Sequence, residues 1–157
     1  MIQIFTQNNI TMNNHRHGIE PDIFLKDEGL TSFFHMTSTN VDRRGRSFVS
    51  TIESIHPSHY PYYATQYHPE KNEFEYATYP GTNIPYESIN HSEKAIYASF
   101  SLAEFFVRQL RKNKSGSYTL VDRHPLIYTY PMKHGLSFEQ IFLIPTASHW
   151  NPSKQVN

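Results

Sequence analysis

A histidine and a glutamate separated by one proline, His68-Pro69-Glu70, are the residues of this chain best suited by type and spacing to acid–base chemistry. They end a tyrosine-rich segment, residues 60–71, which the sequence predicts as a strand ending at His68. On an extended chain residues i and i+2 point to the same side, and a proline biases the residue before it away from helix. The imidazole and the carboxylate are therefore expected to share one face.

A histidine beside a carboxylate is the base and the orienting group of a nucleophilic site. An ordinary strand end is the alternative interpretation of these three residues taken alone. Their position after a strand favours function, because ligands of α/β sheets bind at the carboxyl ends of strands. The nucleophile is the missing part: the 157 residues contain no cysteine, no Gly-x-Ser-x-Gly elbow and no glycine-rich phosphate loop.

A second polar cluster, Asn14-His15-Arg16-His17-Gly18, has two histidines at i and i+2 in a loop that ends in glycine. Such a loop could bind an anionic substrate or a metal ion, or it could be an ordinary solvated loop. A metal site that adds His56, His59 and His68 is disfavoured, because the ten histidines are scattered and no cysteine accompanies them. We therefore expect no metal site and no cofactor.

Composition excludes several classes of partner. Fourteen basic and fourteen acidic residues give a formal charge of zero, and no basic stripe favours nucleic acid. No apolar run approaches the roughly 18 residues that span a bilayer, so no membrane association is expected. The length suits a single domain, and without cysteine neither disulfides nor cysteine zinc sites can form.

Several elements must position these side chains. A short strand over 1–6 and a polar loop over 8–18 come first, followed by a short turn over 20–24. Strands over 32–40 and 46–54 form a hairpin with Gly45 in the turn. The strand that ends at His68 is followed by a long irregular stretch over 71–91, of the kind that is often functional. Further along, a surface loop is predicted over 114–122, strands over 126–130 and 138–144, and a disordered tail over 144–157.

The one strong helix is predicted from Ser92, as its N-cap, to about Lys112. Its apolar residues at helical spacing predict a stripe that packs on a sheet; they are Ile96, Phe100, Ala103, Val107 and Leu110. The three phenylalanines of the helix are predicted to be packing residues; they are Phe100, Phe105 and Phe106.

The ordered set of these segments resembles the C-terminal half of gamma-glutamyl hydrolase, a family of the class I glutamine amidotransferase-like superfamily. The resemblance covers residues 10–144. The matching pieces, in the family's order, are Asn14 to Ile19, Phe33 to Asn40, Phe48 to Glu53, Tyr60-Pro61, Gln66 to Asn72, Ile89 to Ser92, Leu102 to Val107 and Arg111-Lys112.

The resemblance implies an α/β chain that is the C-terminal portion of a flavodoxin-like three-layer α/β/α domain. Residues 1–157 would be a single partial domain, incomplete without its N-terminal half. It also implies a cysteine peptidase that cuts gamma-glutamyl bonds in folate poly-gamma-glutamates or related conjugates. His68 would be the general base, Glu70 its orienting carboxylate, and His15 a substrate-binding residue, with Arg16 and His17 beside it. The stretch 71–91 would line the substrate cleft.

The chain departs from the family pattern at three places. Tyr67 stands where the family has tryptophan, a change that should keep the packing. Arg16 replaces the second histidine of a His-His pair and could meet a glutamate carboxylate. The cysteine elbow and the oxyanion-hole glycines belong to the N-terminal half of the family's proteins, which this chain is expected to follow.

Two hypotheses follow. The chain is part of a gamma-glutamyl hydrolase and supplies histidine and glutamate but not the cysteine, or it is a non-catalytic relic that acts as a binding or subunit module. By itself it is expected to be inactive and to need its N-terminal half or a homologous chain, with a homodimer as one option. Its substrate would be a small molecule, a folyl-poly-gamma-glutamate or a gamma-glutamyl peptide. By resemblance the protein would reside in the vacuole or lysosome or outside the cell.

Overall fold

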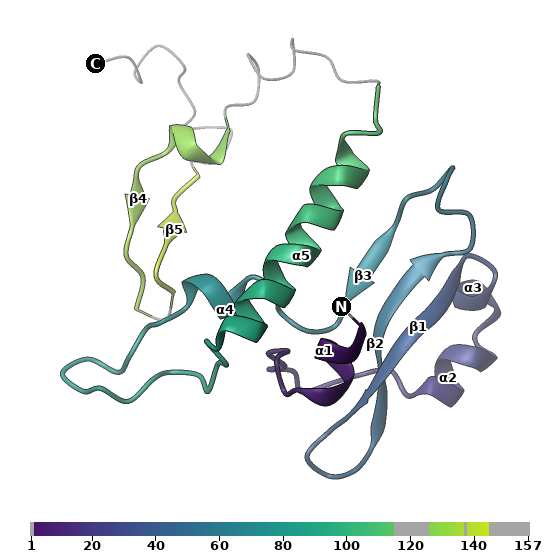
Figure 1. Ribbon diagram of the computed structural model, residues 1–157, viewed down its shortest axis with the longest axis horizontal. Coiled ribbons are helices and arrows are strands. Elements are labelled where there is room, and N and C mark those ends of the chain that lie inside the picture. The colour runs from purple at the N-terminus through teal and green to yellow at the C-terminus, as the bar shows by residue number, and fades with distance from the viewer. Residues whose placement is uncertain (1, 115–125, 137, 145–157) are drawn as a thin grey trace. The chain divides into compact units, whose positions relative to one another are not determined.

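The computed structural model describes residues 2–114, 126–136 and 138–144 (Figure 1). These fall into two compact units. The described part of the first unit is 2–73 and 89–112, and that of the second is 74–88, 113–114, 126–136 and 138–144. The loop predicted over 114–122 and the tail predicted over 144–157 lie outside the described residues, apart from their first residue.

The first unit contains a three-stranded antiparallel sheet in the order β1-β2-β3. Its strands are β1 (Phe34–Val41), β2 (Ser47–Ser54) and β3 (Tyr63–Thr65). The predicted hairpin is confirmed. Gly45 occupies the turn with φ 80°, a conformation that glycine adopts without steric cost. Asp42 closes the turn by accepting hydrogen bonds from the backbone N–H groups of Arg44 (2.8 Å) and Arg46 (2.9 Å).

The prediction that the third strand ends at His68 is wrong, because β3 ends at Thr65. The amide of Gln66 still donates to Ser50 O of β2 (2.8 Å), but the amide of His68 donates to Met12 O (2.9 Å). Proline at position 69 has no amide to continue a ladder. The chain therefore leaves the sheet before His68 and joins the polar loop over 8–18.

The strand predicted over residues 1–6 is also wrong: α1 is a helix over Ile2–Gln7. Ile4 and Phe5, two neighbouring residues of α1, both pack against a core cluster formed by Ile10 and two alanines of α5. A short apolar run cannot be assigned to strand or helix by its pattern alone, so packing decides.

Near the sheet, α2 (Pro21–Lys26) begins with proline and α3 (Glu28–Thr31) is capped by Asp27, whose Oδ1 accepts from Leu30 N (3.0 Å).

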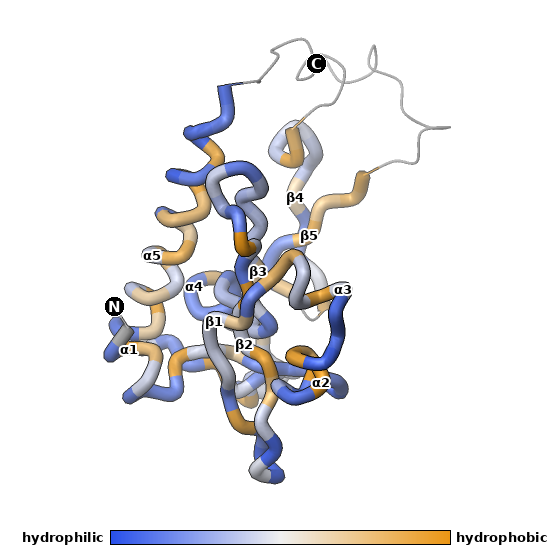
Figure 2. Tube along the Cα trace, turned by 90° about the vertical axis from the view of Figure 1, so that its right-hand side faces the viewer, coloured by the Kyte–Doolittle hydropathy of each residue, from blue (hydrophilic) through white to orange (hydrophobic). Residues whose placement is uncertain are grey.

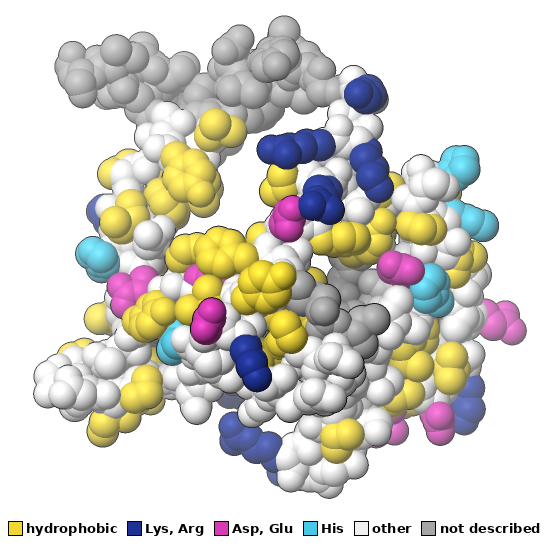
Figure 3. Space-filling view, in the orientation of Figure 1, with side chains coloured by type: hydrophobic (Ala, Val, Ile, Leu, Met, Phe, Trp, Pro, Cys, Tyr) yellow, Lys and Arg dark blue, Asp and Glu magenta, His cyan; other side chains and the backbone are white. Residues whose placement is uncertain are grey.

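The long helix is confirmed as α5 (Glu93–Leu110). Its N-cap is Ser92, as predicted, and the Ser92 hydroxyl accepts from Ala95 N (3.4 Å). Figure 2 shows hydrophilic and hydrophobic positions alternating along it, and Figure 3 shows basic side chains gathered over its C-terminal part. Cations there complement the negative end of the helix dipole.

The face of α5 that packs differs from the predicted stripe. The buried residues are Ala95, Ala98 and Ser99, whereas Phe100 and Leu110 of the predicted stripe are exposed. Small side chains let neighbouring backbone approach closely, and their low hydrophobicity hides such a face from a pattern that weights large apolar residues. All three phenylalanines predicted to pack are exposed, although Phe105 still meets the ring of Tyr63 edge to face at 4.8 Å.

The second unit contains a short antiparallel pair, β4 (Met132–Lys133) and β5 (Ile141–Phe142). The strand predicted over 126–130 is wrong: the 3-10 turn η1 (Ile127–Thr129) lies there. The strand predicted over 138–144 is present only as β5. The stretch over 71–91 begins with the helix α4 (Lys71–Phe74) and contains one isolated bridge, Thr78–Pro85.

Mixed helices and strands agree with the predicted α/β class, and every strand pair among the described residues is antiparallel. In the same part of the chain, no helix is long and apolar enough to cross a bilayer.

Candidate active site

His68 and Glu70 contact one another in the turn that follows β3. The Nδ1 atom of His68 lies 3.3 Å from Oε1 of Glu70, and the two side chains are 35% and 61% exposed. A carboxylate at Nδ1 favours the tautomer that carries its proton there, and this leaves Nε2 as the atom that can accept a proton. The two side chains predicted to share a face therefore do so, although a turn and not a strand brings them together.

The backbone of His68 is fastened to the loop over 8–18 by the hydrogen bond from its amide to Met12 O (2.9 Å). This contact places His15 beside His68. Their imidazole rings stack with centroids 4.9 Å apart and planes inclined by 20°. Two histidines that are distant in the sequence thus meet next to Glu70.

The other two residues predicted to bind substrate lie in the same loop. Arg16 and His17 are exposed, and neither forms a hydrogen bond or an ion pair within the described part of the chain. The structure therefore brings together His15, His68 and Glu70, and it leaves Arg16 and His17 facing solvent.

Tyr67 anchors the turn from the inside. It is buried and its ring lies 6.3 Å from that of Phe5 in α1. Burial raises the pKa of the Tyr67 hydroxyl, because the charged phenolate would lose its water. The expected packing role of an aromatic residue at this position agrees with this environment.

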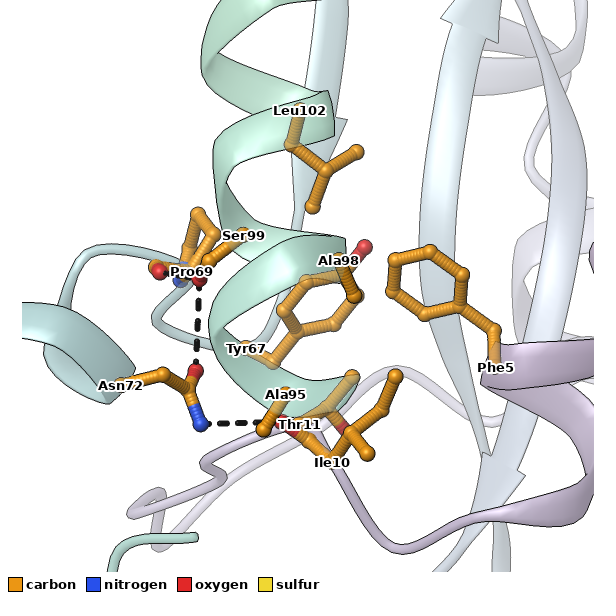
Figure 4. A pocket seen from close by; sticks show the side chains of 10 residues that line it. All are labelled: Phe5, Ile10, Thr11, Tyr67, Pro69, Asn72, Ala95, Ala98, Ser99 and Leu102. Carbon is orange, nitrogen blue, oxygen red and sulfur yellow. Dashed lines mark hydrogen bonds between the residues drawn. The ribbon is translucent and has the colours of Figure 1, made fainter. Parts of the chain in front are cut away.

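Asn72 and Ser99 secure the same turn from the other side. A small cavity of about 10 Å³, enough for roughly one water molecule, lies between these two residues, Tyr67 and the core of α5 (Figure 4). The hydroxyl of Ser99 donates to the carbonyl oxygen of Pro69, the residue between the histidine and the glutamate. The turn is thus held at its backbone.

Glu73 is a residue that the sequence reasoning missed. Its Oε2 atom is buried without a hydrogen-bond partner among the described residues. Loss of solvent raises the pKa of the Glu73 carboxyl, the negative charge of Glu70 raises it further, and the nearby Ser99 hydroxyl partly opposes both effects. The sequence shows two glutamates three residues apart but contains no sign that one carboxylate oxygen of Glu73 is buried.

Two other expectations concern this site. Within the described residues, no group of three or more histidine, aspartate or glutamate side chains is placed to hold a metal ion. The stretch over 71–91 lies largely in the second unit, so its predicted place along a substrate cleft remains a prediction. The last residue of that stretch, His91, contacts the backbone carbonyl of Asn72 through Nδ1 (2.8 Å).

Comparison with known proteins gives a consistent result. The chain is 33% identical to gamma-glutamyl hydrolase B of Dictyostelium discoideum over 89% of its own length and 39% of that protein. It is 39% identical to a probable gamma-glutamyl hydrolase 3 of Arabidopsis thaliana over 77% of the chain and 31% of that protein. It is 35% identical to the gamma-glutamyl hydrolase of Homo sapiens over 85% of the chain and 40% of that protein. No protein-family model matches. The chain thus spans only 31–40% of the length of these relatives.

Proposed function

Since this chain belongs to the gamma-glutamyl hydrolase family by sequence, we propose that it supplies the general base and its orienting carboxylate to a cysteine peptidase of that type. The class of reaction is inferred from the names of the relatives. The observation that carries the roles is the contact between His68 and Glu70 with His15 stacked on the histidine. The class of substrate is a gamma-glutamyl conjugate, such as a folate poly-gamma-glutamate.

The proposed reaction needs a cysteine from outside these 157 residues, which contain none. Nε2 of His68 takes the thiol proton, and the thiolate attacks the gamma-carbonyl carbon to form a tetrahedral intermediate. When the amide bond breaks, the imidazolium gives this proton to the leaving nitrogen. A water molecule then attacks the thioester and His68 takes a proton from the water. The C–S bond breaks, the product leaves with a free gamma-carboxyl group, and the cysteine recovers its proton from His68.

Glu70 acts through His68 and not on the substrate. With its carboxylate at Nδ1, the imidazole keeps its proton-accepting nitrogen in a fixed direction, and the positive charge that develops on the ring is stabilised. The exposed loop that carries His15, Arg16 and His17 is the proposed binding site for the substrate's carboxylates, because guanidinium and imidazolium groups pair with them.

The fold proposal follows the same family. We place the chain in the C-terminal portion of a flavodoxin-like three-layer domain, and coverage of only 31–40% of the three relatives agrees with a partial domain. Antiparallel strands at the edge of an otherwise parallel sheet are common in this class. The N-terminal half or a homologous chain is the proposed partner, and a vacuolar, lysosomal or extracellular location is proposed by family.

Hydrolysis of a gamma-glutamyl peptide tests the proposal. The longer protein that joins this sequence to a cysteine-bearing half should release glutamate, and His68→Ala should lower kcat by about 10³-fold or more. His59→Ala, which changes an exposed histidine whose Nδ1 contacts Ser58, is the matched control and should keep full activity. The 157 residues alone should show no release. Activity that survives His68→Ala would contradict the assignment and favour the alternative of a non-catalytic binding module.

A further inference from the structure

Asn72 is a polar side chain in an apolar place. It is only 2% exposed, next to the core cluster of Ile10, Ala95 and Ala98. Burying an amide is costly unless its hydrogen bonds are made inside the protein. An apolar residue at this position would stabilise the fold more than a buried amide does. The hydrogen-bond partners of Asn72 therefore indicate what the amide does.

The amide group of Asn72 contacts three segments, and Figure 4 shows its contacts with Ile10 and Ser99. Its Nδ2 atom donates both protons, to Ile10 O (3.1 Å) and to Asn90 O (2.7 Å). Its Oδ1 atom lies 3.4 Å from the hydroxyl of Ser99 in α5. The side chain thus links α4 to the loop over 8–18, to the segment before α5 and to α5 itself.

The same contacts extend to both histidines of the candidate active site. Ile10 precedes Met12, whose carbonyl accepts from the amide of His68, and the same loop carries His15. On the other side, Ser99 donates to the carbonyl of Pro69, directly after His68. The loop that carries one histidine and the turn that carries the other are therefore both fastened around Asn72.

We propose that Asn72 is a positioning residue that sets the stacked arrangement of His15 and His68, an inference that rests on the proposed function only for its effect on catalysis. The Asn72 amide donates to the carbonyl of Ile10, in the loop that carries His15. It also borders the Ser99 hydroxyl, which donates to the carbonyl of Pro69 in the turn that carries His68. These contacts hold the two segments, far apart in the sequence, in register. Both amide protons of Asn72 are donated inside the protein, and a buried polar group paired in this way specifies one arrangement more strictly than apolar packing does. Removing the amide loosens the histidine pair while the core around it remains apolar.

The test compares Asn72→Ala and Ser99→Ala with Ser54→Ala, all in the longer protein described above. Ser54 is the matched control because it is equally buried and its hydroxyl donates to Tyr60 O, away from the histidines. One readout is the nuclear Overhauser contact between the rings of His15 and His68, which needs no activity. The other is kcat and KM on a gamma-glutamyl peptide.

Asn72→Ala is expected to weaken the contact between the rings and to lower kcat about 10- to 100-fold, with KM changed less than about 3-fold. Ser99→Ala should act in the same direction more weakly, because Asn72 keeps both of its donated bonds. Ser54→Ala should leave both readouts unchanged. If Asn72→Ala does not fold, Ser99→Ala carries the test.

The proposal is overturned if Asn72→Ala and Ser99→Ala both show the same ring contact and the same kcat as Ser54→Ala. Asn72 would then have a purely structural role. A wild-type protein without His68-dependent hydrolysis would instead refute the proposed function. In that case the contact between the rings still decides whether Asn72 positions the pair.

Discussion

Replacing Glu73 by glutamine should stabilise the protein at neutral pH. The Oε2 atom of Glu73 is buried without a hydrogen-bond partner among the described residues, and Glu70 adds a second negative charge nearby. A buried acceptor left unpaired costs about 1–3 kcal/mol. Glutamine keeps the shape and removes the charge, but it leaves one amide group to satisfy, so the expected gain is near the lower end, about 1 kcal/mol.

The gain should depend on pH with a definite sign. Because the pKa of Glu73 in the folded protein is raised above its usual value of 4.5, the fold favours the protonated form. The stability that this carboxyl contributes is complete below about pH 4 and is lost as pH rises through the raised pKa. The difference between Glu73→Gln and the wild type should therefore be small in acid and should grow toward neutral pH.

Urea unfolding followed by circular dichroism between pH 4 and pH 8 measures this difference. The matched control is Glu104→Gln, which removes an exposed glutamate that pairs with Arg108 at 2.6 Å across one turn of α5. The change Glu104→Gln should lower the free energy of unfolding by at most about 0.5 kcal/mol. A difference for Glu73→Gln that does not vary with pH, or that grows toward acid, would show that the carboxyl is not held out of water and would refute the reasoning.

Three further outcomes are expected. Phe24→Ala should lower the free energy of unfolding by about 3–5 kcal/mol, whereas Ile23→Ala on the exposed side of α2 should lower it far less; urea unfolding measures both. Gly45→Ala should cost about 1–2 kcal/mol by the same assay, from the left-handed φ alone, since nothing lies within 4 Å of the added methyl group. Tyr67→Phe should remove part of the stability loss above pH 10, because the raised pKa of Tyr67 makes the folded state lose stability as the hydroxyl ionises. Thermal unfolding at alkaline pH measures this loss, with Tyr128→Phe as the exposed control.

Interactions within a few residues were predictable from the sequence. The hairpin depends on Gly45 and on the carboxylate of Asp42, which accepts hydrogen bonds from amides two and four residues later. The start of α5 depends on Ser92, which caps an amide three residues away. Such contacts involve no distant partner, so residue type and spacing are sufficient to predict them.

Errors arose where distant packing decides. The first residues form α1 because Ile4 and Phe5 pack on the core beside α5, and β3 ends early because the amide of His68 pairs with Met12. The helix α5 packs through a face other than the predicted apolar stripe, since alanine and serine at the contact let the backbones approach. No pattern along one segment contains these partners.

The candidate site divides in the same way. The sequence by itself determined the resemblance to gamma-glutamyl hydrolases and the spacing of the candidate pair His68 and Glu70, because a motif and its order along the chain are properties of sequence alone. Only the tertiary structure decided that His15 stacks on His68, that one carboxylate oxygen of Glu73 is buried and that Asn72 joins the segments of the two histidines. The physical reason is that burial and contact depend on which distant segments exclude water from a side chain, and the packed fold alone sets this.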